Sequence, residues 1–280
     1  MAINYQKINE LNFTKNFELF YKDKNKKNLN NLKRDYKLIV KNYLDKNSYF
    51  LIIKNFEKNG LKLEKKIKLF ERFVSLLGQN DKNEKVVKVR PKKLLIKLKK
   101  KEKKILRYHQ TNLGGSIHSD GPQLKIPPNY IIMACMEQAQ SGGDSIIANT
   151  KKIYDDLNQN NKKTLKILKE KIIFERRGFN KEKLTFLKPI FLKKKNKLSF
   201  RYLRDYIDSG FKVESKIMSN DQSKALKELD KMLISKKYQK KYRLDKGDII
   251  LLNNNILAHG RTAFKISKNI NRTLLRAWIK

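Results

Sequence analysis

The sequence is poor in cysteine, proline and tryptophan, and it has no long apolar run. Its 280 residues include one cysteine, five prolines and one tryptophan. The single cysteine, Cys135, excludes an internal disulfide and makes a reducing cytoplasm the expected compartment. No segment approaches the roughly 18 to 20 uninterrupted apolar residues of a membrane-spanning helix. The start of the chain also lacks the apolar region of a secretory signal, so we expect no association with a membrane.

Acidic residues are scarce beside basic ones. The chain has 27 acidic residues against 67 lysines and arginines, a formal net charge of +40. This charge raises the alternative of a protein that binds nucleic acid or another polyanion. However, 12 of the basic residues are arginine and 55 are lysine, although arginine suits bidentate phosphate and base contacts better. The lysines are spread over the whole chain, so we expect most to be solvated and regard nucleic acid as the less favoured partner.

The first third of the chain predicts helices around one buried strand. Residues 1–35 form a lysine-rich N-terminal segment, for which we expect helices with an exposed start. Helical apolar spacing predicts helices over 35–47 and 63–78, and "SYFLIIKNF" (48–56) predicts a buried strand. The very basic block 90–105 predicts a solvated strand edge or loop.

The rest of the chain is richer in short strands. Apolar runs predict strands within 129–137 and 141–149, and 150–172 has a helical pattern. A further helix is expected where Ser219 and Gln222 stand in capping-box spacing. Three β-rich segments follow: "DKGDIILLNN", "ILAHGRTAF" and "NRTLLRAWIK". This order predicts a mainly β fold with helices (α+β), a β-barrel or jelly roll.

Two of the three histidines suggest a metal site. His118 precedes Asp120 by two residues in "GGSIHSDGPQLKIPP", and His259 closes "DIILLNNNILAH". Residues i and i+2 of a strand share a face, so His118 and Asp120 can present an imidazole and a carboxylate side by side. With His259 they form a two-histidine, one-carboxylate set that suits iron(II). An H-x-D pair alone is a weak signal, and a lone histidine is commonly a satisfied core residue.

Two arginines near the C-terminus add an independent clue. Arg272 and Arg276 would share one face of a strand. If that strand lines a barrel, the buried cations need anionic partners. A dicarboxylate co-substrate would supply one, with its distal carboxylate bound by an arginine. The alternative is a pair of surface arginines on an edge strand.

Together these motifs resemble the taurine dioxygenase/clavaminate synthase-like family of Fe(II)- and 2-oxoglutarate-dependent oxygenases. The resemblance rests on "IHSDG", "GGDSIIAN", "DKGDIILLNNNILAHGRTAF" and "NRTLLRAWI", which follow one another in the family's order. With "SYFLIIKNF" it covers residues 36–280 and leaves 1–35 outside. It implies a double-stranded β-helix, or jelly-roll barrel, with N-terminal helices. That barrel would form a single domain over 36–280, with a helical insert at about 150–245.

The resemblance also implies roles for individual residues. Arg272 resembles the arginine that binds the 5-carboxylate of 2-oxoglutarate, and Ser145 stands where the family often has a threonine that contacts it. Arg276 resembles a second arginine that assists 2-oxoglutarate or binds an acid group of the substrate, and these two roles stay open. His109 matches no ligand position. The iron ligands of the family correspond to His118, Asp120 and His259.

The implied activity is hydroxylation of an aliphatic C–H bond in a small polar metabolite, an amino acid or another acid, with Fe(II), 2-oxoglutarate and dioxygen. The carboxylate of Asp120 favours hydroxylation over halogenation, whereas desaturation and cyclisation stay open as reaction outcomes. Whether the protein forms a homo-oligomer also stays open. One alternative is a polyanion-binding protein on a non-catalytic barrel. A second alternative is a zinc hydrolase, which would need a general base that the sequence does not reveal. Four arginines of the insert are candidates for substrate recognition, with solvated or structural roles favoured: Arg176, Arg177, Arg201 and Arg204.

Overall fold

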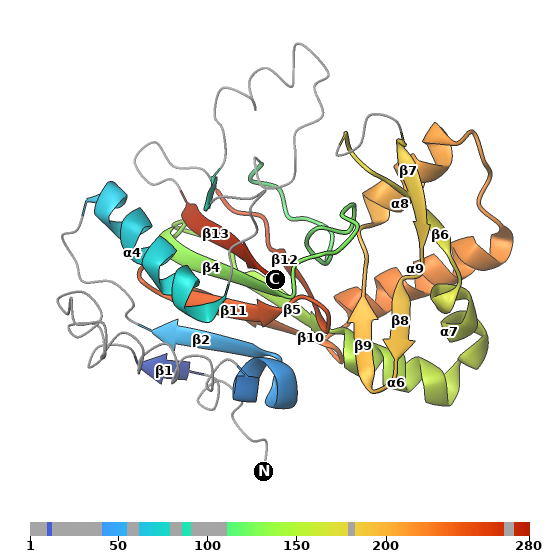
Figure 1. Ribbon diagram of the computed structural model, residues 1–280, viewed down its shortest axis with the longest axis horizontal. Coiled ribbons are helices and arrows are strands. Elements are labelled where there is room, and N and C mark those ends of the chain that lie inside the picture. Colours follow the sequence, from blue (N-terminus) through green and yellow to red (C-terminus); the bar gives the residue numbers. More distant parts are fainter. Residues whose placement is uncertain are drawn as a thin grey trace.

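Two β-sheets lie at the centre of the molecule, and helices cover their outer faces (Figure 1). We describe the protein from a computed structural model. The described residues are 10–12, 41–54, 62–78, 86–90, 111–178, 183–265 and 272–280.

The larger sheet has six strands within the described residues, in the order β1-β2-β11-β4-β13-β3. β1 pairs with β2 in parallel, and the other neighbours are antiparallel. The predicted strands at 129–137 and at the C-terminus are therefore direct neighbours, and one strand separates the predicted strand at 48–56 from the one at 129–137. Their bounds are β1 (Glu10–Asn12), β2 (Phe50–Lys54), β3 (Val87–Val89), β4 (Tyr130–Glu137), β11 (Ile249–Asn253) and β13 (Thr273–Ile279).

The smaller sheet has three antiparallel strands in the order β10-β5-β12. They are β10 (Gln239–Tyr242), β5 (Ser145–Asn149) and β12 (Leu257–Arg261). In this register His259 lies opposite Ile147, and Arg261 lies opposite Ser145. The predicted strand after the "GGDS" turn is thereby confirmed, and it brings two distant parts of the chain together.

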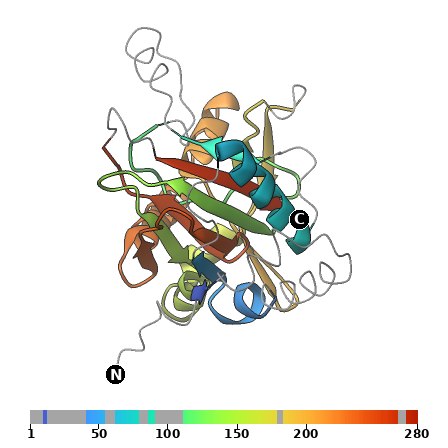
Figure 2. The same cartoon turned by 90° about the vertical axis from the view of Figure 1, so that its left-hand side faces the viewer.

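Successive side chains of a strand point to opposite faces of the sheet, and this explains how the layers pack. On β2, Phe50 and Ile52 belong to the core between the two sheets, whereas Leu51 and Ile53 pack in the core beneath the predicted helix α4 (Leu63–Leu77). Because both faces are buried, the strand is continuously apolar rather than alternating with polar residues. Figure 2 shows α4 lying across the outer face of the larger sheet.

An insert after β5 covers the outer face of the smaller sheet (Figure 1). Its described residues contain four helices and two hairpins. The helices within 150–172 and after Ser219 were expected, whereas the helix over 204–213 and the two hairpins were not predicted from the sequence. The capping box of Ser219 and Gln222 is confirmed at the start of α9. The elements are α6 (Thr150–Asn160), α7 (Lys162–Lys169), β6 (Ile172–Glu175), β7 (Thr185–Lys188), β8 (Phe191–Lys194), β9 (Lys197–Phe200), α8 (Arg204–Val213) and α9 (Asn220–Ile234).

The N-terminal part departs from expectation where it is described. Helices were expected over 1–35, but Glu10–Asn12 form strand β1, which completes the exposed edge of β2. The helix predicted over 35–47 is a π-helix, η1, in its described part (Lys41–Asn47). The remainder of 1–35 and, apart from Arg90, the basic block 90–105 lie outside the described residues. No helix within the described ranges is long and apolar enough to cross a membrane.

Packing of α4 should contribute strongly to stability. Phe73 is fully buried between α4 and the larger sheet, so Phe73→Ala should lower the free energy of unfolding by about 3–5 kcal/mol. Glu71→Ala, at an exposed position of the same helix, should change it by less than about 0.5 kcal/mol. Urea unfolding measures both values. Similar losses in the two variants would contradict the packing of α4 on this face.

Candidate metal centre

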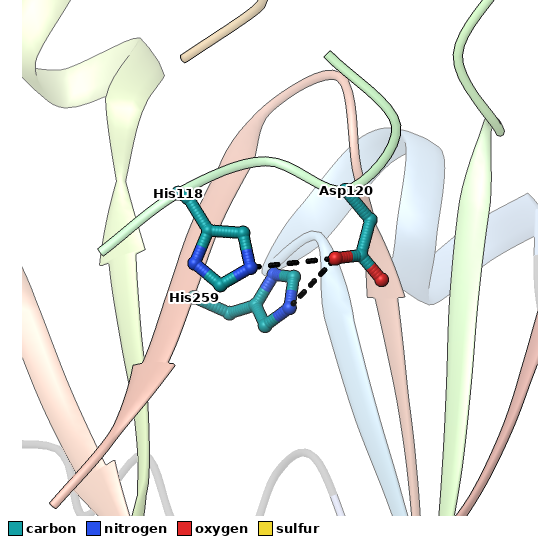
Figure 3. Close-up of side chains that lie close together, drawn as sticks. All are labelled: His118, Asp120 and His259. Carbon is teal, nitrogen blue, oxygen red and sulfur yellow. Dashed lines mark ion pairs between the residues drawn. The ribbon is translucent and has the colours of Figure 1, made fainter. Parts of the chain in front are cut away.

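The side chains of His118, Asp120 and His259 meet at one point between the two sheets (Figure 3). Each offers one ligand atom, and these atoms lie within 4.8 Å of one another. Oδ1 of Asp120 is 3.4 Å from Nε2 of His118 and 3.7 Å from Nε2 of His259. The two imidazole rings are 4.7 Å apart between centroids. The sequence therefore predicted correctly that these three residues come together.

Backbone pairing sets the distance between the two histidines. The N–H of His118 donates to the carbonyl of His259 at 2.9 Å, and the N–H of His259 donates back at 2.8 Å. This is a single antiparallel bridge at the edge of the smaller sheet, and the segment that carries it is otherwise irregular. The expectation that His118 and Asp120 share the face of a regular strand is therefore wrong. Instead, the loop after His118 turns the carboxylate of Asp120 back towards the imidazoles.

The protonation states suit metal binding. Nδ1 of His118 is 2.9 Å from the carbonyl of Ser116, so a proton on Nδ1 leaves the Nε2 lone pair facing Asp120. Burial lowers the pKa of His259 to about 4, against the attraction of Asp120, and keeps this ring neutral. Burial alone would raise the pKa of Asp120, yet Arg276 and the two imidazoles hold it well below its usual range. The site thus presents the neutral imidazole of His259 and the ionised carboxylate of Asp120.

The loop that carries Asp120 is fixed on both sides. From the turn between β11 and β12, the buried side chain of Asn254 accepts from the N–H of Asp120 at 2.8 Å. It also donates to the carbonyls of Asp120 and Pro128 at 3.0 and 2.9 Å. From the insert, Tyr202 pairs with Ser119 through two hydrogen bonds of 2.9 Å. The insert and the turn therefore hold the ligand loop between them.

Arg272 lies beside the glycine turn that precedes β5. Its Nε donates to Oε1 of Gln138 at 3.1 Å and to the carbonyl of Gly143 at 3.2 Å. Gly143 has a φ of +79°, and a Cβ there would lie 2.7 Å from Nε of Arg272. A glycine is thus required both by the backbone conformation and by the close approach of the arginine. The "GGDS" motif thus contacts Arg272 through Gly143, and Arg272 and Ser145 line the same pocket.

Arg276 contacts the candidate ligand directly. Its Nη1 donates to Oδ2 of Asp120 at 3.1 Å, and its guanidinium lies 4.9 Å from the ring centroid of Trp278. Trp278 donates from Nε1 to the same Oδ2 at 2.7 Å. A bulge between Thr273 and Leu274 interrupts the strict alternation that the sequence suggested for the arginines. Arg272 and Arg276 nevertheless both reach the pocket.

One pocket contains all six candidate residues. It encloses about 480 Å³ of empty space, including its open mouth. Its charged lining residues are three arginines and one carboxylate, so the pocket favours anionic ligands. The lining consists of Val89, His118, Asp120, Met133, Ser145, His259, Gly260, Arg261, Arg272, Leu274 and Arg276.

Three supporting residues escaped the sequence analysis, which singled out neither Trp278 nor Asn254 nor Arg261. Arg261 donates to the carbonyls of Leu113 and Thr111 at 2.8 and 2.7 Å, which holds the segment before His118 against β12. Two features of the sequence could have pointed to Arg261 and Trp278. Arg261 is a charged residue inside "HGRTAF", and Trp278 is the only tryptophan of the chain and follows Arg276 by two residues.

The arginines of the insert have structural contacts, as favoured. Arg201 donates to the carbonyls of Pro122 and Leu124, both at 2.7 Å, and burial lowers its pKa to about 10. The other three also contact the protein through ion pairs or aromatic rings: Arg176, Arg177 and Arg204. His109 lies outside the described residues.

Comparisons with known proteins agree with this geometry. The family profile described as "Taurine catabolism dioxygenase TauD, TfdA family" matches residues 29–278. FR-33289 synthase of Streptomyces rubellomurinus is 29% identical over 183 residues, 63% of this chain and 52% of that protein. Gamma-butyrobetaine dioxygenase of Homo sapiens is 27% identical over 172 residues, 58% of this chain and 43% of that protein. The chain thus spans about half, or less, of these curated relatives.

Solved structures confirm the fold. An asparagine oxygenase in complex with Fe(II), hydroxyasparagine and succinate has a TM-score of 0.71 at 13% identity, covering 97% of this chain and 93% of that one. The non-heme iron oxygenase OrfP with Fe and alpha-ketoglutaric acid has a TM-score of 0.62 at 13% identity, covering 89% and 79%. At these identities the likeness shows the fold alone, and it confirms the predicted jelly roll.

Loss of the Asn254 side chain should loosen the ligand loop. Asn254→Ala leaves one N–H and two carbonyls without their partner, at a cost of about 1–3 kcal/mol of unfolding free energy for each buried group left unpaired. Asn255→Ala is the matched control, because its amide contacts only the exposed Asn129 side chain, at 3.2 Å. Urea unfolding of the metal-free protein compares the two. Equal stability of both variants would contradict this role.

Proposed function

Because the chain belongs to the taurine catabolism dioxygenase TauD, TfdA family, we propose that it is an Fe(II)- and 2-oxoglutarate-dependent oxygenase. It hydroxylates an aliphatic C–H bond of a small polar metabolite, an amino acid or another acid. The observation that carries this proposal is the convergence of two imidazole nitrogens and one carboxylate oxygen, from distant parts of the chain, within 4.8 Å.

The donor set fits iron(II). Two imidazoles and one carboxylate on one side of a metal leave open positions, the pattern of non-heme iron oxygenases. His118, Asp120 and His259 would hold the ion. The depressed pKa values of Asp120 and His259 support this fit, because the carboxylate is ionised and the imidazole neutral without a metal-driven loss of protons.

The pocket also fits a dicarboxylate. Arg272 would bind the 5-carboxylate of 2-oxoglutarate, since a guanidinium can contact both oxygens of a carboxylate. Its Nε is already held by Gln138 and Gly143, which fixes the orientation of the planar group. Ser145 lines the same pocket and would add a hydroxyl contact.

The chain contributes position and exclusion of water. When bound, iron(II) and 2-oxoglutarate supply the oxidising chemistry, in which dioxygen is consumed, succinate and carbon dioxide form, and an oxygen atom enters the substrate C–H bond. The three candidate ligands are themselves at most 9% exposed. The hydrogen bonds of Asn254 and Tyr202 hold the ligand loop in place, so little rearrangement is needed during reaction.

The substrate class follows from the charge of the lining. Arg276 and Arg261 join Arg272 on the pocket wall, which supports a substrate with a carboxylate or sulfonate group. No Phe, Tyr or Trp lies among the described lining residues, so the aromatic cage that binds quaternary amines is not formed there. The solved structures with a similar fold include an asparagine oxygenase and an OrfP complex with hydroxy-L-Arg, which supports an amino acid as the substrate.

Two other functions have less support. Asp120 is the only carboxylate among the described lining residues, and it is a candidate ligand, so a hydrolase would have no general base in the pocket. A polyanion-binding role rests on the net charge alone. We place the enzyme in the cytoplasm, because a chain with a single cysteine forms no internal disulfide.

Anaerobic reconstitution tests the function. Addition of iron(II) and 2-oxoglutarate to the metal-free protein should give the weak visible charge-transfer absorption of the iron–2-oxoglutarate chelate. Dioxygen and a panel of amino acids and other acids should then yield succinate. His118→Ala should abolish the absorption, whereas replacement of the third histidine, His109→Ala, should leave it. Absence of both the absorption and succinate formation in the wild type would contradict the proposed function.

The turn before β5 gives a sharper test of 2-oxoglutarate binding. Gly143→Ala should displace Arg272, because the new Cβ would lie 2.7 Å from its Nε. The 2-oxoglutarate concentration for half-maximal rate should rise about 10- to 100-fold, the effect of losing a charged hydrogen bond. Gly178→Ala is the matched control, because Gly178 has a similar φ of +77° with nothing within 4 Å of its Cβ position.

Arg272→Ala should raise the same requirement at least as much, because it removes the guanidinium itself. Unchanged 2-oxoglutarate dependence in Gly143→Ala and Arg272→Ala would show that another residue binds the co-substrate.

A further inference from the structure

The two oxygens of the Asp120 carboxylate face different partners. Oδ1 lies 3.4 and 3.7 Å from the Nε2 atoms of His118 and His259, the side on which a metal would bind. Oδ2 accepts hydrogen bonds from Trp278 at 2.7 Å and from Arg276 at 3.1 Å. One oxygen is therefore directed to the candidate ligands and the other is engaged by the C-terminal strand.

The two donors to Oδ2 differ in character. Trp278 is 3% exposed and packs in the core between the sheets. The single N–H of its side chain donates a hydrogen bond to Asp120. Its ring therefore cannot turn without leaving the carboxylate. Arg276 is only partly buried and lines the pocket. Trp278 is thus the donor that the surrounding packing keeps in one place.

We propose that Trp278 is a positioning residue that makes Asp120 a monodentate metal ligand, an inference that rests on the proposed function. Its N–H keeps Oδ2 engaged and turns Oδ1 towards the imidazoles. A carboxylate that offered both oxygens would take up a second coordination position, which the co-substrate or dioxygen needs. Groups that orient a ligand in this way commonly contribute about 10- to 100-fold to metal affinity or activity.

Two replacements of Trp278 separate the N–H from the bulk of the ring. Trp278→Phe removes the donor and part of the volume. β-(3-Benzothienyl)alanine at position 278, introduced by nonsense suppression, keeps both fused rings and replaces only the N–H by sulfur. Tyr130→Phe is the matched control. It also removes one aromatic donor from a carboxylate, the 2.7 Å bond to Asp45, but on the side of the larger sheet that faces α4.

The first measurement is Mn(II) binding by electron paramagnetic resonance, which needs no turnover. Both Trp278 replacements should weaken Mn(II) binding about 10- to 100-fold, and Tyr130→Phe should bind as the wild type does. A second measurement uses the fact that Trp278 is the only tryptophan. Saturating Mn(II) should quench the tryptophan fluorescence of the wild type, because the indole contacts a ligand of the metal. The third measurement is the ratio of succinate formed to substrate hydroxylated, which should rise in the benzothienyl protein.

The outcomes distinguish this proposal from the proposed function. If the wild type binds Mn(II) and turns over, but the benzothienyl protein has the same affinity and the same coupling ratio, Trp278 does not position Asp120 while the oxygenase assignment stands. If the wild type neither binds Mn(II) nor forms succinate, both proposals fail. A Trp278→Phe protein that does not fold leaves the decision to the benzothienyl protein, which keeps the shape of the core.

Discussion

A buried carboxylate, Asp120, is the group on which the rest of the site depends. Removal of an ionised carboxylate from water is costly, and it is tolerated only where charges and hydrogen bonds replace the lost hydration. Here Arg276 and Trp278 contact Oδ2, the two imidazoles face Oδ1, and Asn254 binds the backbone of the same residue. These contacts leave the carboxylate ionised and directed to one place before any metal arrives.

The fold brings these groups together because each layer supplies one of them. The smaller sheet places His259 and fixes His118 against it through two backbone hydrogen bonds. The larger sheet brings Arg276 and Trp278 on β13, whose inward-facing side chains reach the ligand loop. The insert closes the arrangement through Tyr202 and Arg201, which bind the loop on either side of Asp120. The jelly roll is thus a frame in which residues far apart in sequence converge.

Much of this could be predicted from the sequence, and what escaped has a physical reason. Continuous apolar runs predicted the strands that contain Ile52, Ile132 and His259, because strands with both faces buried are apolar at successive residues. The pair His118 and Asp120 was found from its spacing, although its local geometry is a loop and not a strand. The role of Asn254 could not be predicted, because a turn asparagine and a buried anchor look alike until the fold brings Asp120 to it. The hairpin of β8 and β9 escaped because its lysines face solvent and weaken the alternation.

The most direct test of the central claim is the position of a metal in crystals of the protein grown without oxygen in the presence of Mn(II) or Fe(II). Anomalous scattering should place one ion in contact with Nε2 of His118, Nε2 of His259 and Oδ1 of Asp120, with Oδ2 still bound by Trp278. A crystal that binds the metal elsewhere, or shows no peak between these three residues at saturating concentration, would contradict the assignment of this site.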